Sequence, residues 1–260
     1  MDFELGLKLV LTPVLIGLAS LAGRRWGESV GGWLVGIPFT SGPIVLFLAL
    51  AHGTSFAAAA SLGVVVGTVS QTAFVLAYAL VARQAGWAYA VLAGTAGFAL
   101  VTVAARAALP PLWVALPVAI ASLLVGIALL PRAAAAGVRV KAPAWDLPIR
   151  MLVATVLVVA LTSVAPRLGA QLTGLLAPYP LYAAVLAVFA HAQAGAVAGV
   201  QVLRGLLYGL FSFAFFFTAL ALALVPLGLA PAFAIALALG VVAQTLSLRA
   251  LNGPLLPARR

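Results

Sequence analysis

Long apolar segments separated by short polar ones dominate this chain. Each segment is close to the roughly 20 residues that a helix needs to cross the hydrocarbon core of a bilayer. The segments lack the alternation of apolar and polar residues that marks the strands of a membrane β-barrel. The pattern predicts an all-α, polytopic integral membrane bundle of about nine transmembrane helices. These helices are expected over residues 4–22, 29–51, 55–82, 87–108, 111–131, 147–165, 170–193, 196–226 and 229–250.

The composition excludes a soluble protein. Of the 260 residues 65% are apolar and 7% are charged, whereas roughly a quarter of a soluble domain is charged. So few charges cannot cover the surface of a soluble enzyme, a disordered chain or a nucleic-acid-binding domain. The chain contains four acidic residues, and all of them lie near the ends of predicted helices: Asp2, Glu4, Glu28 and Asp146.

Basic residues are distributed unevenly between the two sides of the predicted bundle. Arg24, Arg25 and Arg83 fall on the same side as the basic residues of the 132–141 loop and of the C-terminus. Lys and Arg are enriched in cytoplasmic loops, so this side is expected to face the cytoplasm. The N-terminus is then outside and the C-terminus inside.

The sequence matches itself at an offset of 142 residues. The matched residues include Pro38 with Pro180, Gly53 with Gly195, Gly63 with Gly205, Gly67 with Gly209 and Ser70 with Ser212. Such residues determine backbone conformation and helix contacts, so the matches point to an internal repeat and not only to a shared apolar composition.

The repeat divides the chain into a four-helix unit (1–110), a linking helix with a cytoplasmic loop (111–145) and a second four-helix unit (146–260). One extra helix between the units reverses the membrane direction of the second unit. The expected arrangement is an inverted-topology repeat, written 4+1+4, as found in many secondary transporters. A duplicated subunit that was fused merely to make a stable bundle remains the alternative.

Two predicted helices are interrupted by Pro and Gly at corresponding positions, within residues 31–43 and 177–182. Proline leaves backbone carbonyls without partners, which in a membrane must face protein or a water-lined cavity. Paired interruptions of this kind mark transport sites, although an ordinary proline kink gives the same pattern. The candidate substrate-binding residues near them are Pro38, Thr40, Ser41, Ser70, Gln71, Tyr179, Pro180, Tyr182, Tyr208 and Ser212.

Two further features concern the helices beside these interruptions. The G-x-x-x-G pairs Gly63/Gly67 and Gly205/Gly209 are candidate helix-packing residues, because small residues on one face allow close backbone approach. Arg204 lies well inside a predicted helix and has no carboxylate at its depth. Its side chain either extends to the lipid headgroups or contacts an anionic group inside the bundle. Because that anionic group could be the substrate, Arg204 is the last of the candidate substrate-binding residues.

The layout of residues 1–108 resembles a known family. A basic pair at Arg24–Arg25 is followed by Gly31-Gly32-Trp33-Leu34, a Pro-x-Thr-Ser segment from Pro38 and an apolar hairpin. This layout resembles the small four-span bacterial membrane proteins of the GlpM type, which have been linked to exopolysaccharide production. The second unit departs from it at Leu175, Tyr182 and Ala183. The resemblance implies two fused units in a bacterial inner membrane and no defined activity.

The expected function is that of a permease that works by alternating access on a small neutral or anionic solute. The absence of membrane-embedded carboxylates argues against cation coupling, and no metal, cofactor or enzymatic activity is expected. A flippase or scramblase for anionic envelope lipids, and an accessory subunit without transport, are the alternatives. The expected partners are the bilayer and a small solute or lipid, without nucleic acid, and a homodimer is left open.

Overall fold

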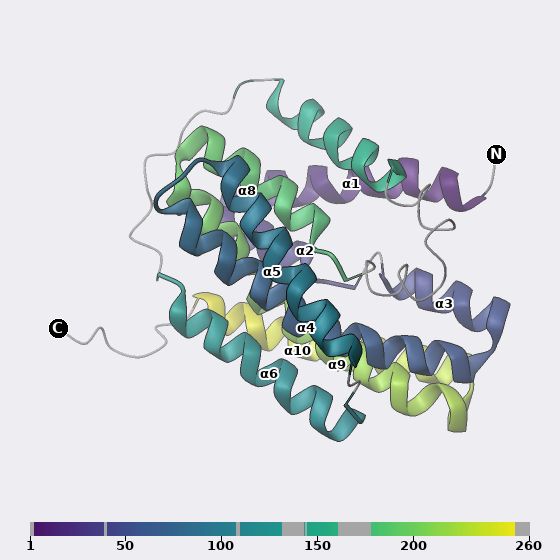
Figure 1. The fold of residues 1–260 in the computed structure, drawn as a ribbon. Helices are drawn as coiled ribbons and strands as arrows, with labels where there is room; N and C mark the ends of the chain where they lie inside the picture. The colour runs from purple at the N-terminus through teal and green to yellow at the C-terminus, as the bar shows by residue number, and fades with distance from the viewer. Residues whose placement is uncertain are drawn as a thin grey trace.

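The computed structural model describes residues 3–38, 41–107, 110–131, 143, 145–160 and 178–252. Every regular element in these ranges is an α-helix (Figure 1). Residues 146–160 are helical as well. The labelled helices are α1 (Phe3–Trp26), α2 (Glu28–Val35), α3 (Ser41–His52), α4 (Thr54–Ala82), α5 (Trp87–Ala107), α6 (Leu112–Leu129), α8 (Leu181–Ala194), α9 (Ala196–Leu227) and α10 (Leu229–Asn252).

Six helices, α1, α4, α5, α6, α9 and α10, are long and apolar enough to cross a membrane. They indicate a multi-pass membrane protein and confirm the all-α prediction. The count of nine crossing helices is not confirmed, because α2, α3 and α8 are too short to span a bilayer alone.

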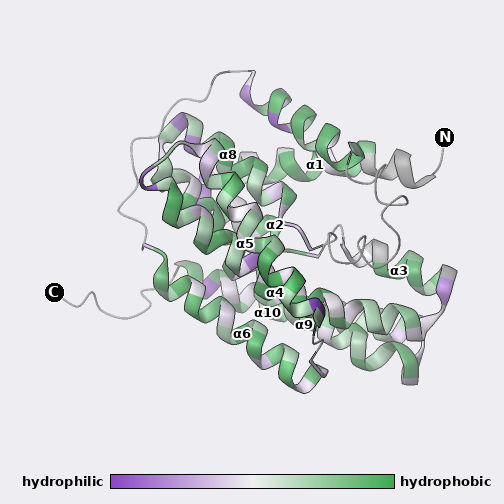
Figure 2. Cartoon of the chain, viewed as in Figure 1, coloured by the Kyte–Doolittle hydropathy of each residue, from purple (hydrophilic) through white to green (hydrophobic). Residues whose placement is uncertain are grey.

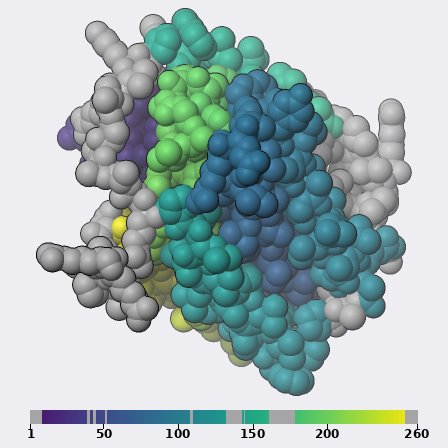
Figure 3. Space-filling model, turned by 60° about the vertical axis from the view of Figure 1, so that its left-hand side comes forward, coloured from purple at the N-terminus to yellow at the C-terminus, as the bar shows by residue number. Residues whose placement is uncertain are grey.

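The centre of the bundle is formed by α4 and α9. Of their apolar segments 61% is buried, against 22% for α5 and α6, which lie outside them. The end of α4 lies beside the start of α9, where a Cβ at Gly199 would be 3.1 Å from the Tyr78 hydroxyl. In Figure 3 the blue residues of α4 and α5 lie beside the green residues of α8 and α9, above the teal α6.

The outer helices expose apolar side chains. Leu100 on α5 is 73% exposed and Trp113 on α6 is 78% exposed. Figure 2 shows hydrophobic residues along most of the length of these helices. An apolar outer surface over a packed interior is the arrangement that a bilayer requires, because lipid replaces water around the bundle.

Single glycines connect the short helices to the two central ones. Gly53 lies between α3 and α4, Gly195 lies between α8 and α9, and both have a φ of 87°. Side chains rarely adopt this left-handed region, so glycine allows the chain to reverse through one residue. The two glycines are 142 positions apart, and each precedes a central helix of similar length.

The predicted helix over 29–51 is interrupted as its Gly and Pro content indicates. α2 ends at Val35, and the N–H of Gly36 still reaches back to the Trp33 carbonyl. Gly36, Ile37 and Pro38 follow outside any helix, as the ring of Pro38 favours, and α3 begins at Ser41. In the second half α8 begins directly after Pro180, whereas residues 161–177 lie outside the described ranges.

Candidate functional site

The backbones of α2 and α9 touch directly. A Cβ at Gly205 would lie 1.8 Å from the Ser29 carbonyl oxygen, and one at Gly32 would lie 1.8 Å from the Val202 carbonyl oxygen. No side chain other than hydrogen fits at either position. The Ser29 hydroxyl also donates to Gln201 Oε1 at 3.1 Å, which ties the start of α2 to the start of α9.

The same contact recurs with the halves exchanged. A Cβ at Gly36 would lie 2.5 Å from the Gly209 Cα, and a Cβ at Gly67 would lie 2.5 Å from Pro178 Cγ. An offset of 142 converts the first pair into the second, because Gly36 corresponds to Pro178 and Gly67 to Gly209. Each central helix therefore contacts the interrupted segment of the other half. Gly63 has no such contact, since a Cβ there meets nothing within 4 Å.

The last helix supports the interrupted end of α2. Gln244 Nε2 donates to the carbonyl of Trp33 at 3.2 Å, and Trp33 Nε1 donates to the Ser247 hydroxyl at 3.0 Å. The carbonyl near the interruption thus receives a side-chain donor from α10. The same carbonyl also accepts from the Gly36 N–H at 3.2 Å, so the contact with Gln244 is a second hydrogen bond that holds α10 against the interrupted end of α2.

A cavity of about 60 Å³ lies between α1, the end of α2 and the start of α8. At ~30 Å³ for each water molecule, this volume holds about two waters. α1 and the end of α2 belong to the first half of the chain and α8 belongs to the second, so both halves contribute to the cavity wall. The lining residues are Leu15, Leu18, Ala19, Leu34, Val35, Ile37 and Tyr182.

One polar residue of the described chain, Tyr182, lines this cavity. The hydroxyl of Tyr182 is 3.0 Å from that of Thr12 on α1, and either can be the donor. Among the predicted substrate-binding residues, Tyr182 lines the cavity, and Pro38 is buried next to its lining residue Ile37. Thr40, predicted for the same place, lies outside the described residues.

The other predicted polar residues are engaged between helices. Tyr179 bonds to Thr95 at 2.9 Å, and Pro180 immediately precedes α8. Ser70 accepts from Thr102 at 2.8 Å, and Ser212 donates to the Gly240 carbonyl at 2.8 Å. Ser41, Gln71 and Tyr208 are buried. None of these residues lines the cavity.

Arg204 has protein partners that the sequence did not predict. Its Nη1 donates to the carbonyls of Leu130 and Pro131 at 3.1 and 2.9 Å, at the end of α6. A guanidinium there pairs with the negative end of the helix dipole. Its Cζ lies 5.9 Å from the centre of the Tyr208 ring, so these two candidates lie together but away from the cavity.

Sequence reasoning missed a buried ionic cluster. Asp146 is 0% exposed and accepts from Arg24 Nη2 at 2.6 Å, from Arg150 Nε at 2.9 Å and from Gln193 Nε2. Arg150 is itself 5% exposed, and its guanidinium lies 5.1 Å from the Phe189 ring. The cluster joins α1 to the helix over 146–160 and to the end of α8. We call Arg24, Asp146, Arg150 and Gln193 the ionic cluster.

The environment of the ionic cluster shifts the pKa values of two carboxyl groups, Asp146 and Glu28, in opposite directions. Burial alone would raise the pKa of Asp146, but the hydrogen bonds from Arg150 and Arg24 outweigh it and hold this pKa below its ordinary value. Burial raises the pKa of Glu28, because desolvation exceeds the attraction of the same two arginines. Asp146 is therefore the stable anion of the group.

A signal for the ionic cluster is present in the sequence. Asp146 and Arg150 are four residues apart at a helix start, the spacing at which opposite charges meet on one helix face. At the offset of 142 they match Glu4 and Lys8, whose side chains are not among those described. The contact with Arg24, which is 122 positions away, has no local signature.

Basic residues of the described chain collect at the end of the bundle that holds the ionic cluster. Hydrogen bonds between Ser29 and Gln201 and between Tyr78 and His191 bring the start of α2, the end of α4 and the start of α9 to this end. We call it the arginine-rich end. Its basic residues are Arg24, Arg25, Arg83, Arg150, Arg204 and Arg249.

Comparison with known proteins gives no relative. No protein-family model, curated protein sequence or solved structure matches the chain. The fold and the contacts above therefore carry the functional argument alone.

Proposed function

We propose that this chain is a small permease that works by alternating access between two inverted repeats. The observation that carries the proposal is the reciprocal packing of Gly36 on Gly209 and of Gly67 on Pro178. Two halves that contact each other through equivalent residues can exchange roles without losing their packing. In this topology α2 and α3 together cross the membrane as one interrupted helix.

The substrate site is the cavity at the interruption of α2. It is bounded by Ile37 from the first half and Tyr182 from the second, so a relative movement of the halves changes its opening. Among the described residues, Tyr182 is the one polar residue that lines it, and no carboxylate does. The Tyr182 hydroxyl lies 3.0 Å from that of the buried Thr12. A single hydroxyl in an otherwise apolar lining suits a small neutral or anionic solute that accepts or donates a hydrogen bond.

The ionic cluster closes the arginine-rich end in this conformation. It connects α1 of the first half with the helix over 146–160 and with α8 of the second half. A buried carboxylate with several donors holds these helices together only while the ion pairs remain intact. Opening toward this side requires Asp146 to leave Arg24.

The arginine-rich end is cytoplasmic in the proposed topology, as the bias in basic residues favours. The chain has no cysteine, so single cysteines can be introduced without background labelling. In intact cells we expect Ser55→Cys to react with a membrane-impermeant maleimide and Gln84→Cys to react only after lysis. Both side chains are exposed, at opposite ends of α4. The reverse pattern of labelling contradicts this orientation.

Cysteine accessibility also tests alternating access without knowledge of the substrate. In oriented proteoliposomes, an Ile37→Cys variant should react with a small charged thiol reagent mainly from the side opposite the arginine-rich end. Adding Asp146→Asn should raise its reactivity from the arginine-rich end about tenfold, which corresponds to a shift of ~1.4 kcal/mol in the conformational equilibrium.

Gln84→Cys serves as the control, because this side chain is exposed at the arginine-rich end and lies outside the cavity. Its reactivity should not change with Asp146→Asn. If Ile37→Cys reacts from neither side in both backgrounds, the bundle is closed and the protein is a non-transporting accessory subunit. Equal reactivity from both sides in the unmodified background also contradicts alternating access.

A further inference from the structure

One face of α1 carries an exposed apolar stripe that ends at an arginine. Val10, Val14, Leu18 and Leu21 are between 48% and 65% exposed, and Arg25 follows four residues after Leu21. Spacings of three and four residues place all five side chains on one face of the helix. The stripe from Val10 to Leu21 is about 16 Å long, close to half of the ~30 Å hydrocarbon core.

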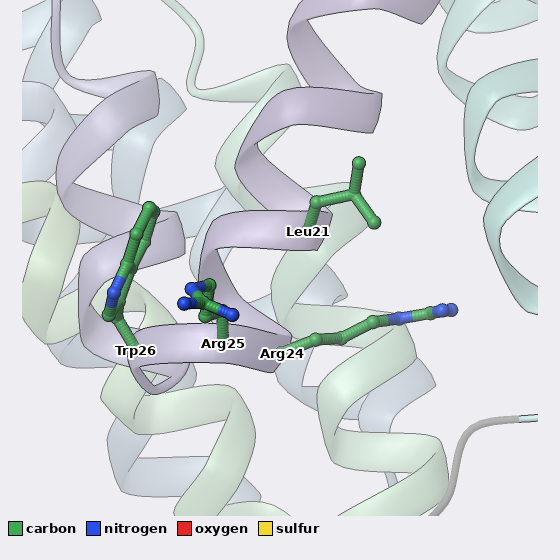
Figure 4. A pocket seen from close by; sticks show the side chains of 4 residues that line it. All are labelled: Leu21, Arg24, Arg25 and Trp26. Carbon is green, nitrogen blue, oxygen red and sulfur yellow. The ribbon is translucent and has the colours of Figure 1, made fainter.

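A surface hollow of about 670 Å³ lies at the end of this stripe. It is lined by Leu21, Arg24, Arg25 and Trp26, in the last two turns of α1. Figure 4 shows Arg24 and Trp26 projecting to opposite sides, with Arg25 between them and Leu21 one turn away. The Arg25 guanidinium lies 5.8 Å from the centre of the Trp26 ring, and Trp26 is 65% exposed.

We propose that this hollow binds the phosphate of an anionic membrane lipid whose acyl chain lies along the stripe. Guanidinium groups form paired hydrogen bonds with phosphate oxygens, and both Arg24 and Arg25 line this hollow. An indole beside them is the side chain that membrane interfaces favour at headgroup level. Because the stripe continues from the hollow to the depth of one leaflet, a lipid matches both parts, whereas a free phosphate uses only the arginines.

The lipid site and the ionic cluster share one residue. Arg24 donates to the fully buried Asp146, while its own side chain is 35% exposed on the surface. A lipid phosphate therefore approaches the Arg24 guanidinium from the outside, while Asp146 holds the same guanidinium from the inside. The lipid adds a second anion to a guanidinium that joins the two halves, and this binding does not depend on whether the chain transports a solute.

Native mass spectrometry of the purified full chain in detergent tests the proposal. We expect the protein to retain dioleoylphosphatidylglycerol in preference to dioleoylphosphatidylcholine, with at least one tightly held molecule. Arg25→Gln should weaken retention of the anionic lipid about fivefold, the effect of losing ~1 kcal/mol for one basic side chain at a membrane surface. Arg249→Gln is the matched control, because Arg249 is also exposed in the last turn of a helix at the arginine-rich end. The Arg249→Gln variant should retain as much of the anionic lipid as the unmodified protein does.

Two outcomes overturn the proposal. Equal losses for Arg25→Gln and Arg249→Gln show that the anionic lipid responds to the overall charge of this end and not to the hollow. Displacement of the bound lipid by inorganic phosphate or glycerol phosphate at equal concentration shows a free-anion site without a role for the stripe. Circular dichroism of both variants confirms that each one is folded before retention is compared.

Discussion

Replacing Gly205 with alanine is expected to destabilise the folded bundle by about 3 kcal/mol, at the upper end of the usual cost of overpacking. The added Cβ would lie 1.8 Å from the Ser29 carbonyl oxygen and 2.9 Å from the Ser29 Cα. Both are backbone atoms, so no side chain can rotate away, and α2 has to separate from α9. Thermal unfolding in detergent, followed by circular dichroism, measures the loss.

The equivalent residue of the first half provides the matched control. Gly63 also lies within a long central helix, but a Cβ there meets nothing within 4 Å. Gly63→Ala should be neutral or stabilise the fold by up to ~1 kcal/mol, because alanine has the higher helix propensity. Similar losses of stability for the two variants would contradict the close approach of α2 and α9.

Replacing Asp146 with alanine is expected to cost about 3–5 kcal/mol, the usual effect of removing one partner from a buried ion pair. Arg150 is only 5% exposed and would remain as an uncompensated charge. Arg24 would lose its link to the second half at the same time. Thermal unfolding of the purified protein in detergent measures this effect as well.

A second substitution separates the charge from the packing. If the buried Arg150 causes the loss, Asp146→Ala combined with Arg150→Met should be more stable than Asp146→Ala alone, because a buried pair can be replaced by apolar residues at little cost. Additive losses in the double variant would show that Asp146 acts only through Arg24 and Gln193.

The long helices could be read from the sequence because their limits are set locally. The predictions 55–82 and 196–226 differ by one residue at one end from α4 and α9 as observed. Each of these helices starts after a glycine and is predominantly apolar, so hydropathy and backbone preference agree. The interruption of the helix over 29–51 was equally local, since proline and glycine act on their own backbone.

The contacts that define the site could not be read in this way. Gly63 and Gly205 occupy the same place in the same motif, yet only Gly205 lies against another backbone. The partner, Ser29, is more than 170 positions away and has no recognisable pattern. Asp146 looked like an ordinary charge at a helix end, and only the fold shows that Arg24 and Gln193 surround it.

The close contact of α2 with α9 also constrains the order in which the protein can be made. Ser29 and Gln201 are 172 positions apart, so α2 leaves the ribosome long before its partner exists. At ~5–20 residues per second this interval is roughly 9–34 s. During that time the glycine face of α2 contacts lipid or the insertion machinery instead of α9. The first half therefore reaches its final packing only after the second half has been synthesised and inserted.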